Sequence, residues 1–193
     1  MIEEREQRAA SLMQALSQGR DDALNRLMAD WSGPLIGYLT KLTGSSATGE
    51  DLAQETFVRV YRSCKDYRPA QRFSTWLFTI ASNLAKNHHR WKKRHPEDSQ
   101  EPQAMNEIGV ATEQADPAES ISRQETMQTL QRAVKQLPEP MRQALLLSVT
   151  QGLSYQEIAR IQNSSEKAVE LRVYRARKQL REWMAGHLSE LAF

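Results

Sequence analysis

The segment GLSYQEIARIQNSSEKAVELRVYRARKQL, residues 152–180, decides the fold of the C-terminal part of the chain. Ser154, followed three residues later by Glu157, is a capping box, which predicts that a helix begins there. Asn163 tolerates the left-handed backbone conformation that a tight turn needs, and Ser165 can cap the next helix. A short helix, a turn of three or four residues and a longer basic helix together form a helix-turn-helix.

The longer helix of this segment has two distinct faces. Its apolar residues recur at i, i+4, i+7 and i+11, which predicts a buried stripe of Val169, Val173, Ala176 and Leu180. At about 100° per residue, the opposite face carries Lys167, Leu171, Tyr174, Arg175 and Lys178. A basic helix face can simply be solvated, but the turn and the two caps favour insertion into the major groove of DNA. An exposed Leu beside Tyr and Arg also suits a thymine methyl group or a partner surface.

A second basic segment, NLAKNHHRWKKRH at residues 83–95, contains five Lys or Arg residues and three His. It ends a helix that we expect from Thr75 to about Trp91, with Ser74 as its N-cap. The inner face of this helix carries Leu77, Ile80, Ala81 and Leu84. Another stripe carries Trp76, Thr79, Asn83, Lys86, Asn87 and Arg90. Aromatic, amide and cationic groups in one row can stack on unpaired bases, bond their edges and contact phosphates.

Other interpretations of this helix are open. Trp76 could be an ordinary core residue. His88, His89 and His95 could suggest a metal site, but adjacent His residues on a helix point about 100° apart, and no Cys or carboxylate lies in register with them. We therefore expect no metal and interpret the tail RWKKRH as a phosphate contact whose affinity depends on salt.

The remaining periodicity predicts an all-α protein, because apolar residues recur at three and four rather than two. Residues 21–31 form one helix, Gly33-Pro34 separates it from LIGYLTKL, and EDLAQETFVRVYRS is a third helix with Ala53, Phe57, Val60 and Cys64 on one face. We expect a compact helical domain at residues 1–95 and a helix-turn-helix domain at residues 123–193. Residues 96–122 hold three Pro, seven acids and no base, which predicts a flexible linker.

The distribution of charge separates these segments. Lys and Arg minus Asp and Glu gives 15 − 10 = +5 for residues 1–95, 0 − 7 = −7 for residues 96–122 and 11 − 7 = +4 for residues 123–193. Two basic blocks joined by an acidic link indicate a nucleic-acid partner. The single Cys64 excludes an intrachain disulfide. No signal-peptide pattern and no apolar run of about 18 residues is present, so we expect a soluble, cytoplasmic protein.

Two strings of sequence resemble a known family. EDLAQETFVRVYRS followed by RFSTWLFTIASNLAKNHHR, and LPEPMRQALLLSVTQGLSYQEIARI followed by AVELRVYRARKQLRE, resemble the sigma factors of the extracytoplasmic-function (ECF) group of the sigma-70 family. The resemblance covers about residues 20–183 apart from the linker. It implies a subunit that binds core RNA polymerase and directs promoter recognition, strand opening and transcription initiation at a stress- or metal-responsive set of genes.

The resemblance also assigns roles to residues. It places Asp51, Gln54 and Glu55 on the surface that docks on the polymerase clamp helices, and the linker in a positively charged channel. It assigns the melted minus-ten element to Trp76, Asn83, Lys86, Asn87 and Arg90, with Asn83 receiving a flipped base. The minus-thirty-five element would be read by Lys167, Leu171, Arg172, Tyr174, Arg175 and Lys178.

The resemblance has limits and alternatives. Glu170 and Leu171 stand where many members carry a basic and a small polar residue, and Gln162 and Ser164 occupy turn positions that are often apolar. We expect no catalytic activity and no cofactor, a free monomer without membrane insertion, and an anti-sigma factor as regulator. A stand-alone repressor or activator that uses only residues 152–180, and a metal-dependent enzyme that uses the His cluster, are the competing functions.

Overall fold

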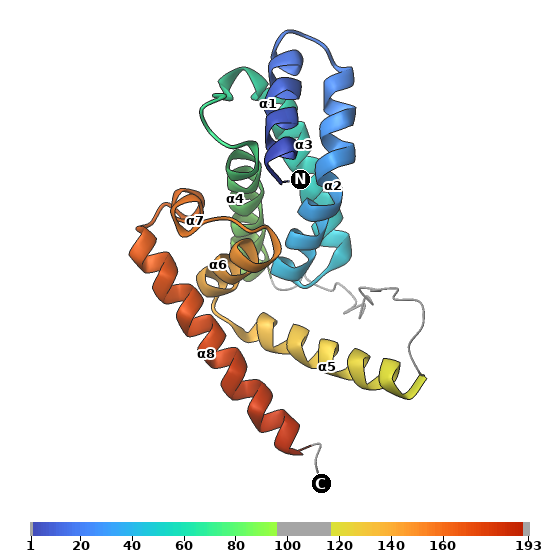
Figure 1. Cartoon of the computed structure of the whole chain (residues 1–193), viewed down its shortest axis with the longest axis vertical. Coiled ribbons are helices and arrows are strands. Elements are labelled where there is room, and N and C mark those ends of the chain that lie inside the picture. Colours follow the sequence, from blue (N-terminus) through green and yellow to red (C-terminus); the bar gives the residue numbers. More distant parts are fainter. Residues whose placement is uncertain (1, 96–116, 191–193) are drawn as a thin grey trace.

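A computed structural model of the chain describes residues 2–95 and 117–190, and their regular structure is helical, without a strand (Figure 1). The N-terminal elements, here called the front domain, are α1 (Ile2–Ser17), α2 (Asp22–Thr43), α3 (Ser46–Arg62), the short 3₁₀ helix η1 (Cys64–Asp66) and α4 (Phe73–Arg94). The C-terminal elements, the rear domain, are α5 (Pro117–Gln136), α6 (Glu139–Thr150), α7 (Tyr155–Gln162) and α8 (Glu166–Glu190). The predicted all-α, two-domain architecture is confirmed. Residues 96–116 of the predicted linker lie outside the described residues, and residues 117–122, which we assigned to the linker, are already helical as the start of α5.

Helix α2 runs without interruption through Gly33-Pro34, where the sequence predicted a break. Proline has no N–H, so the carbonyl of Asp30, four residues earlier, has no partner within the helix. The guanidinium of Arg5, on α1, donates a hydrogen bond to that carbonyl and lies 4.0 Å from the centre of the Trp31 ring. A neighbouring helix therefore satisfies the group that Pro34 leaves unpaired.

The start of α4 also depends on α1. The backbone N–H of Ser74 donates to Oε2 of Glu6 at 3.2 Å, and Glu6 is only 6% exposed. The prediction that the Ser74 side chain caps this helix is wrong, because α4 begins at Phe73 and a carboxylate from α1 binds its N-terminus instead. Negative charge at that end is favoured by the helix dipole.

The helix-turn-helix forms as its local sequence predicted. Ser154 and Glu157 make both bonds of the capping box, and Asn163 adopts a left-handed conformation with φ of 47°. Oγ of Ser165 accepts a hydrogen bond from the backbone N–H of Ala168 at 3.2 Å, at the start of α8. These bonds fix the angle at which α8 leaves the turn.

The two domains pack against each other. Helix α7 lies on α4 and α6 lies on α2, a contact that we call the seam (Figure 1). Buried apolar residues form one cluster that includes Leu35 and Phe78 of the front domain and Leu147 and Ile158 of the rear domain. Helix α8 packs on α6 and α7 and also contacts α5. The periodicity of single helices did not predict the seam, because it joins residues that are far apart in the chain.

Candidate nucleic-acid interface

The polar row of α4 lies on the surface of the front domain. Asn83, Lys86, Asn87 and Arg90 are exposed, while the inner residues Leu77, Ala81 and Leu84 are buried, as their spacing predicted. Trp76 is half-buried: its ring packs against Tyr67 at 5.3 Å and Phe73 at 6.2 Å between ring centres. Trp76 thus packs against the core and is partly exposed on the row.

Trp91 extends this row, and our sequence analysis did not assign it. It is 48% exposed and stacks on His95, with ring centres 5.1 Å apart and planes inclined by 24°. Trp91 follows Asn83 and Asn87 at steps of four, which is the spacing of one helix face. This spacing was available in the sequence. Lys93 and Arg94, which follow it, are also exposed.

The outward face of α8 is exposed as predicted. Leu171 and Tyr174 are 45% and 65% exposed, and Lys167, Arg175 and Lys178 are also on the surface. Behind them Val169, Val173 and Ala176 are buried. A hydrogen bond from Lys167 Nζ to Glu170 at 2.8 Å, and the negative charge of Glu170, raise the pKa of Lys167. This pair keeps an acid on the face that would approach DNA.

Arg172 occupies a different environment from its neighbours on α8. It is half-buried, and its Nη1 donates to Oε1 of Gln162 at 2.6 Å and to Oγ of Ser164 at 3.0 Å. Gln162 in turn donates to the carbonyl of Pro140 and to Oε1 of Gln143. The polar side chains at the turn are therefore held in place by hydrogen bonds. The structure places Arg172 against the turn rather than in the exposed row.

A third surface lies on α3. Asp51 and Gln54 are exposed, and Glu55 pairs with Arg59 at 2.9 Å. Val58 and Tyr61 are 41% and 45% exposed and stand seven and ten residues after Asp51, so they lie on the same stripe. Sequence reasoning did not identify these two apolar residues. Exposed apolar groups beside acids are typical of a surface that binds a partner protein.

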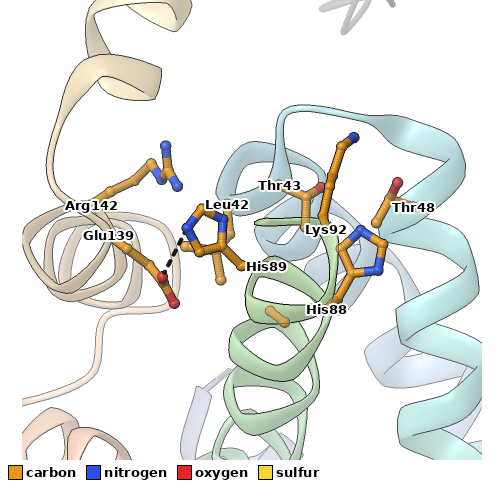
Figure 2. A pocket seen from close by; sticks show the side chains of 9 residues that line it. Leu42, Thr43, Thr48, His88, His89, Lys92, Glu139 and Arg142 are labelled. Atoms are coloured by element: carbon orange, nitrogen blue, oxygen red, sulfur yellow. Dashed lines mark ion pairs between the residues drawn. The ribbon is translucent and has the colours of Figure 1, made fainter. Parts of the chain in front are cut away.

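The histidines at the end of α4 point in different directions (Figure 2). His89 faces α6, where its Nε2 lies 3.8 Å from Oε2 of Glu139, and His88 points towards Thr48 on the other side. Among the described residues, no group of three or more His, Cys, Asp or Glu is arranged to hold a metal ion. The same residues include no helix with the length and hydropathy of a membrane span.

An exposed basic face on a helix-turn-helix, and a cationic row on a separate helix, indicate a DNA-binding protein. Family models describe the same two segments: residues 27–95 match sigma-70 region 2, and residues 127–180 match sigma-70 region 4. The first segment contains the α4 row, and the second contains the turn and the exposed part of α8.

Sequence similarity to known proteins extends over most of the chain. The RNA polymerase sigma-H factor of Pseudomonas aeruginosa is 30% identical over 171 residues, which are 86% of this chain and 89% of that protein. The RNA polymerase sigma factor CarQ of Myxococcus xanthus is 32% identical over 180 residues, 93% and 99% of the two chains. The ECF RNA polymerase sigma-E factor of Haemophilus influenzae is 31% identical over 174 residues, 88% and 92%. The chain therefore belongs to the ECF group of the sigma-70 family, whose members are transcription initiation factors.

Solved structures share the fold. CnrH, in complex with the cytosolic domain of CnrY, superposes with a TM-score of 0.68 at 21% identity and covers 93% of this chain and 98% of CnrH. The sigma factor RpoE of Bartonella quintana, in complex with the anti-sigma factor NepR, gives 0.69 at 23% identity and covers 83% and 96%. The helical architecture of Figure 1 is thus shared with CnrH and with the sigma factor RpoE.

Proposed function

We propose that the chain binds core RNA polymerase, carries it to promoters of a stress- or metal-responsive set of genes, and opens the DNA there. The polymerase catalyses RNA synthesis, while this subunit positions the polymerase at the promoter and separates the DNA strands. The observation that carries the proposal is that two exposed cationic rows, on α4 and α8, are each backed by a buried apolar face. Rigid backing of this kind holds the contacting side chains in a defined register.

The α4 row would engage the unpaired strand of the minus-ten element. Asn83 offers both a donor and an acceptor to the edge of a flipped base, and capture of that edge offsets the few kcal/mol that flipping costs. The half-buried Trp76 supplies a ring fixed by its aromatic neighbours. Lys86 and Arg90 hold the adjoining phosphates, with Asn87 between them. The exposed Trp91 provides a further stacking surface at the end of the row.

The exposed row of α8 would read the minus-thirty-five element in the major groove. Arg175 and Lys178 supply base and phosphate contacts, and Leu171 with Tyr174 supplies apolar contacts. Arg172 supports this row by fixing α8 to the turn. Lys167 forms an ion pair with Glu170, so it attracts phosphate more weakly than a lysine without an acidic partner.

The stripe on α3 would dock on the polymerase. Asp51, Gln54 and Glu55 supply polar contacts, and Val58 with Tyr61 supplies the apolar anchors that contribute most to binding energy in protein interfaces. This arrangement supports a promoter-melting and core-binding domain at residues 1–95, a linker at residues 96–122 and a DNA-binding domain at residues 123–193.

A protein regulator also fits this proposal. Because the solved complex of the Bartonella quintana sigma factor holds the anti-sigma factor NepR, we propose that this chain, a cytoplasmic monomer when free, is held inactive by an anti-sigma factor. Its two separate DNA-contacting rows offer surfaces that such a regulator could cover.

Replacement of Asn83 by Ala tests the central role. Asn83→Ala should reduce promoter opening, measured by permanganate reactivity of unpaired thymines, far more than it reduces binding to core polymerase in a pull-down. Asn25→Ala, which replaces another exposed asparagine, this one on α2, is the matched control and should change neither. Equal losses of opening and core binding in Asn83→Ala would contradict base capture. A wild-type chain that binds duplex DNA but not core polymerase would instead be a stand-alone repressor or activator.

A further inference from the structure

The outward face of α8 is centred on an apolar side chain. At about 100° per residue, Leu171 lies about 140–160° around the helix from the buried residues of α8. Leu171 is 45% exposed, so it stands on the part of the helix surface that is farthest from the core. Within about 60° of it lie Lys167, Tyr174, Arg175 and Lys178.

The position of Leu171 would be the deepest one in a major groove. A recognition helix contacts base edges with its N-terminal residues, and Leu171 lies in the second turn of α8. The side chain opposite the packed face of such a helix points to the floor of the groove, while side chains about 100° to either side point to the phosphate backbones. Among the base edges at the floor, the apolar partner is the C5 methyl group of thymine.

Most cations of this face already have partners. Nζ of Lys167 donates to Oε2 of Glu170 at 2.8 Å, and Lys178 pairs with an acid one turn further along α8. Arg172 is held by the turn. The guanidinium of Arg175 is exposed and has no ion pair or hydrogen bond with the part of the chain that the structure describes. Polar reading of base edges therefore falls mainly to Arg175.

Tyr174 extends the apolar surface beside Leu171. It is 65% exposed and follows Leu171 by three residues, which places the two Cβ atoms about 5–6 Å apart. Successive base pairs of B-DNA are about 3.4 Å apart along the axis. Two side chains at this separation can therefore reach methyl groups on neighbouring base pairs, or on pairs separated by one other.

The charge of the rest of α8 favours DNA over a protein as the partner of this surface. The exposed charged residues that follow Tyr174 are four cations and one acid, namely Arg175, Arg177, Lys178, Arg181 and Glu182. A cationic stretch of this kind suits a row of phosphates. The same helix thus offers apolar groups where base edges would lie and positive charge further along.

We propose that α8 reads its DNA element chiefly through the C5 methyl groups of two thymines, contacted by Leu171 and Tyr174, with Arg175 on a guanine close by. The two thymines are adjacent or one base pair apart. This inference rests on the proposed function, because it specifies what the minus-thirty-five surface recognises.

Removal of single methyl groups from a selected duplex tests this proposal. The full-length chain, bound to core polymerase, first enriches duplexes from a library with a short random segment. Each thymine of the enriched duplex is then replaced in turn by deoxyuridine, which lacks the methyl group and keeps the same hydrogen-bonding edge. At two positions the affinity should fall about fourfold, the effect of leaving one methyl-sized group unburied. At the same positions 5-methylcytosine should bind about fourfold better than cytosine.

Variants of α8 assign each methyl group to a side chain. Leu171→Ala should abolish the effect of deoxyuridine at one position and Tyr174→Ala at the other, as a double-mutant cycle requires of groups in contact. Arg177→Ala, which removes an exposed residue about 120° from Leu171, is the matched control and should keep both effects whatever its overall affinity. Circular dichroism identifies any variant that has lost helix, and the wild-type results on modified duplexes need no variant.

Three results would overturn methyl reading. The first is a wild-type affinity that no deoxyuridine substitution changes, and the second is full methyl sensitivity in both Leu171→Ala and Tyr174→Ala. The third is loss of core-polymerase binding by Leu171→Ala in a pull-down with methyl sensitivity retained, which would assign this face to a protein partner. These results would leave the proposed function standing. A wild-type complex that enriches no sequence at all would refute the proposed function together with methyl reading.

Discussion

The environment of Arg172 predicts that its removal affects stability rather than DNA recognition. Arg172→Ala breaks two hydrogen bonds from a charged donor, at 2.6 and 3.0 Å, to residues that lie at the turn. Bonds to charged groups contribute about 1.5–3 kcal/mol when buried, and both acceptors here are only half-buried, so we expect a total loss of about 2 kcal/mol. For a chain of this length, that lowers Tm by about 4–8 °C.

Arg175→Ala is the matched control for this prediction, since it removes an exposed arginine three residues further along α8. Its stability should change by less than about 0.5 kcal/mol. Its affinity for the minus-thirty-five duplex should fall by about 1–3 kcal/mol, roughly 5- to 150-fold, if it contacts a base edge. Thermal unfolding followed by circular dichroism and fluorescence anisotropy with labelled duplex measure the two effects. If Arg172→Ala kept the wild-type Tm and lost DNA affinity as Arg175→Ala does, our assignment of Arg172 to the turn would be refuted.

Three further changes have defined outcomes. Glu170→Gln frees Lys167, so DNA affinity should rise and the slope of log affinity against log salt should steepen by about one; an unchanged slope would show that Lys167 contacts no phosphate. Gly49→Ala would place a Cβ 2.8 Å from the backbone of α2 and should destabilise the chain by about 1–3 kcal/mol in urea unfolding, whereas Gly37→Ala, with open space around it, should stabilise it by about 0.5–1 kcal/mol. Burial alone would raise the pKa of Glu157, but its bonds from Ser154, the charge of Arg72 and the Thr75 hydroxyl together lower it. Its stabilising contribution is therefore complete above the unfolded pKa of about 4.3 and disappears as pH falls through the lower folded value. Glu157→Gln should therefore lower the free energy of unfolding at pH 7, and that free energy should fall less steeply than in the wild type below about pH 4.3. An unchanged pH dependence of unfolding in acid would contradict this.

The features that could be predicted from the sequence are those formed by neighbouring residues. The capping box of Ser154 and Glu157, the left-handed Asn163 and the apolar stripe of α8 depend on spacings of a few residues, and all three are present, although Leu180 at the end of the stripe is only half-buried. Exposure of the rows on α4 and α8 followed in the same way from helical periodicity.

The features that could not be predicted depend on partners far away in the chain. The break expected at Pro34 and the cap expected from Ser74 were overruled by Arg5 and Glu6, which no local rule connects to them. Arg172 carries the same charge as its exposed neighbours on α8. It differs from them because its guanidinium bonds to polar side chains of the preceding turn. The seam joins helices through ion pairs, such as Arg72 with Glu157, whose members are 85 residues apart.

Helix α1 makes the front domain depend on residues that precede the matching family segment, which starts at residue 27. Removal of the residues before that segment would leave the carbonyl of Asp30 in α2 without its hydrogen-bond donor and expose one face of the Trp31 indole. It would also remove the carboxylate that binds the first turn of α4. Helix α4, which we propose to contact single-stranded DNA, would then fray from the end that carries Trp76. For this sigma factor, the smallest fragment in which the front domain keeps its fold should therefore be longer than residues 27–95.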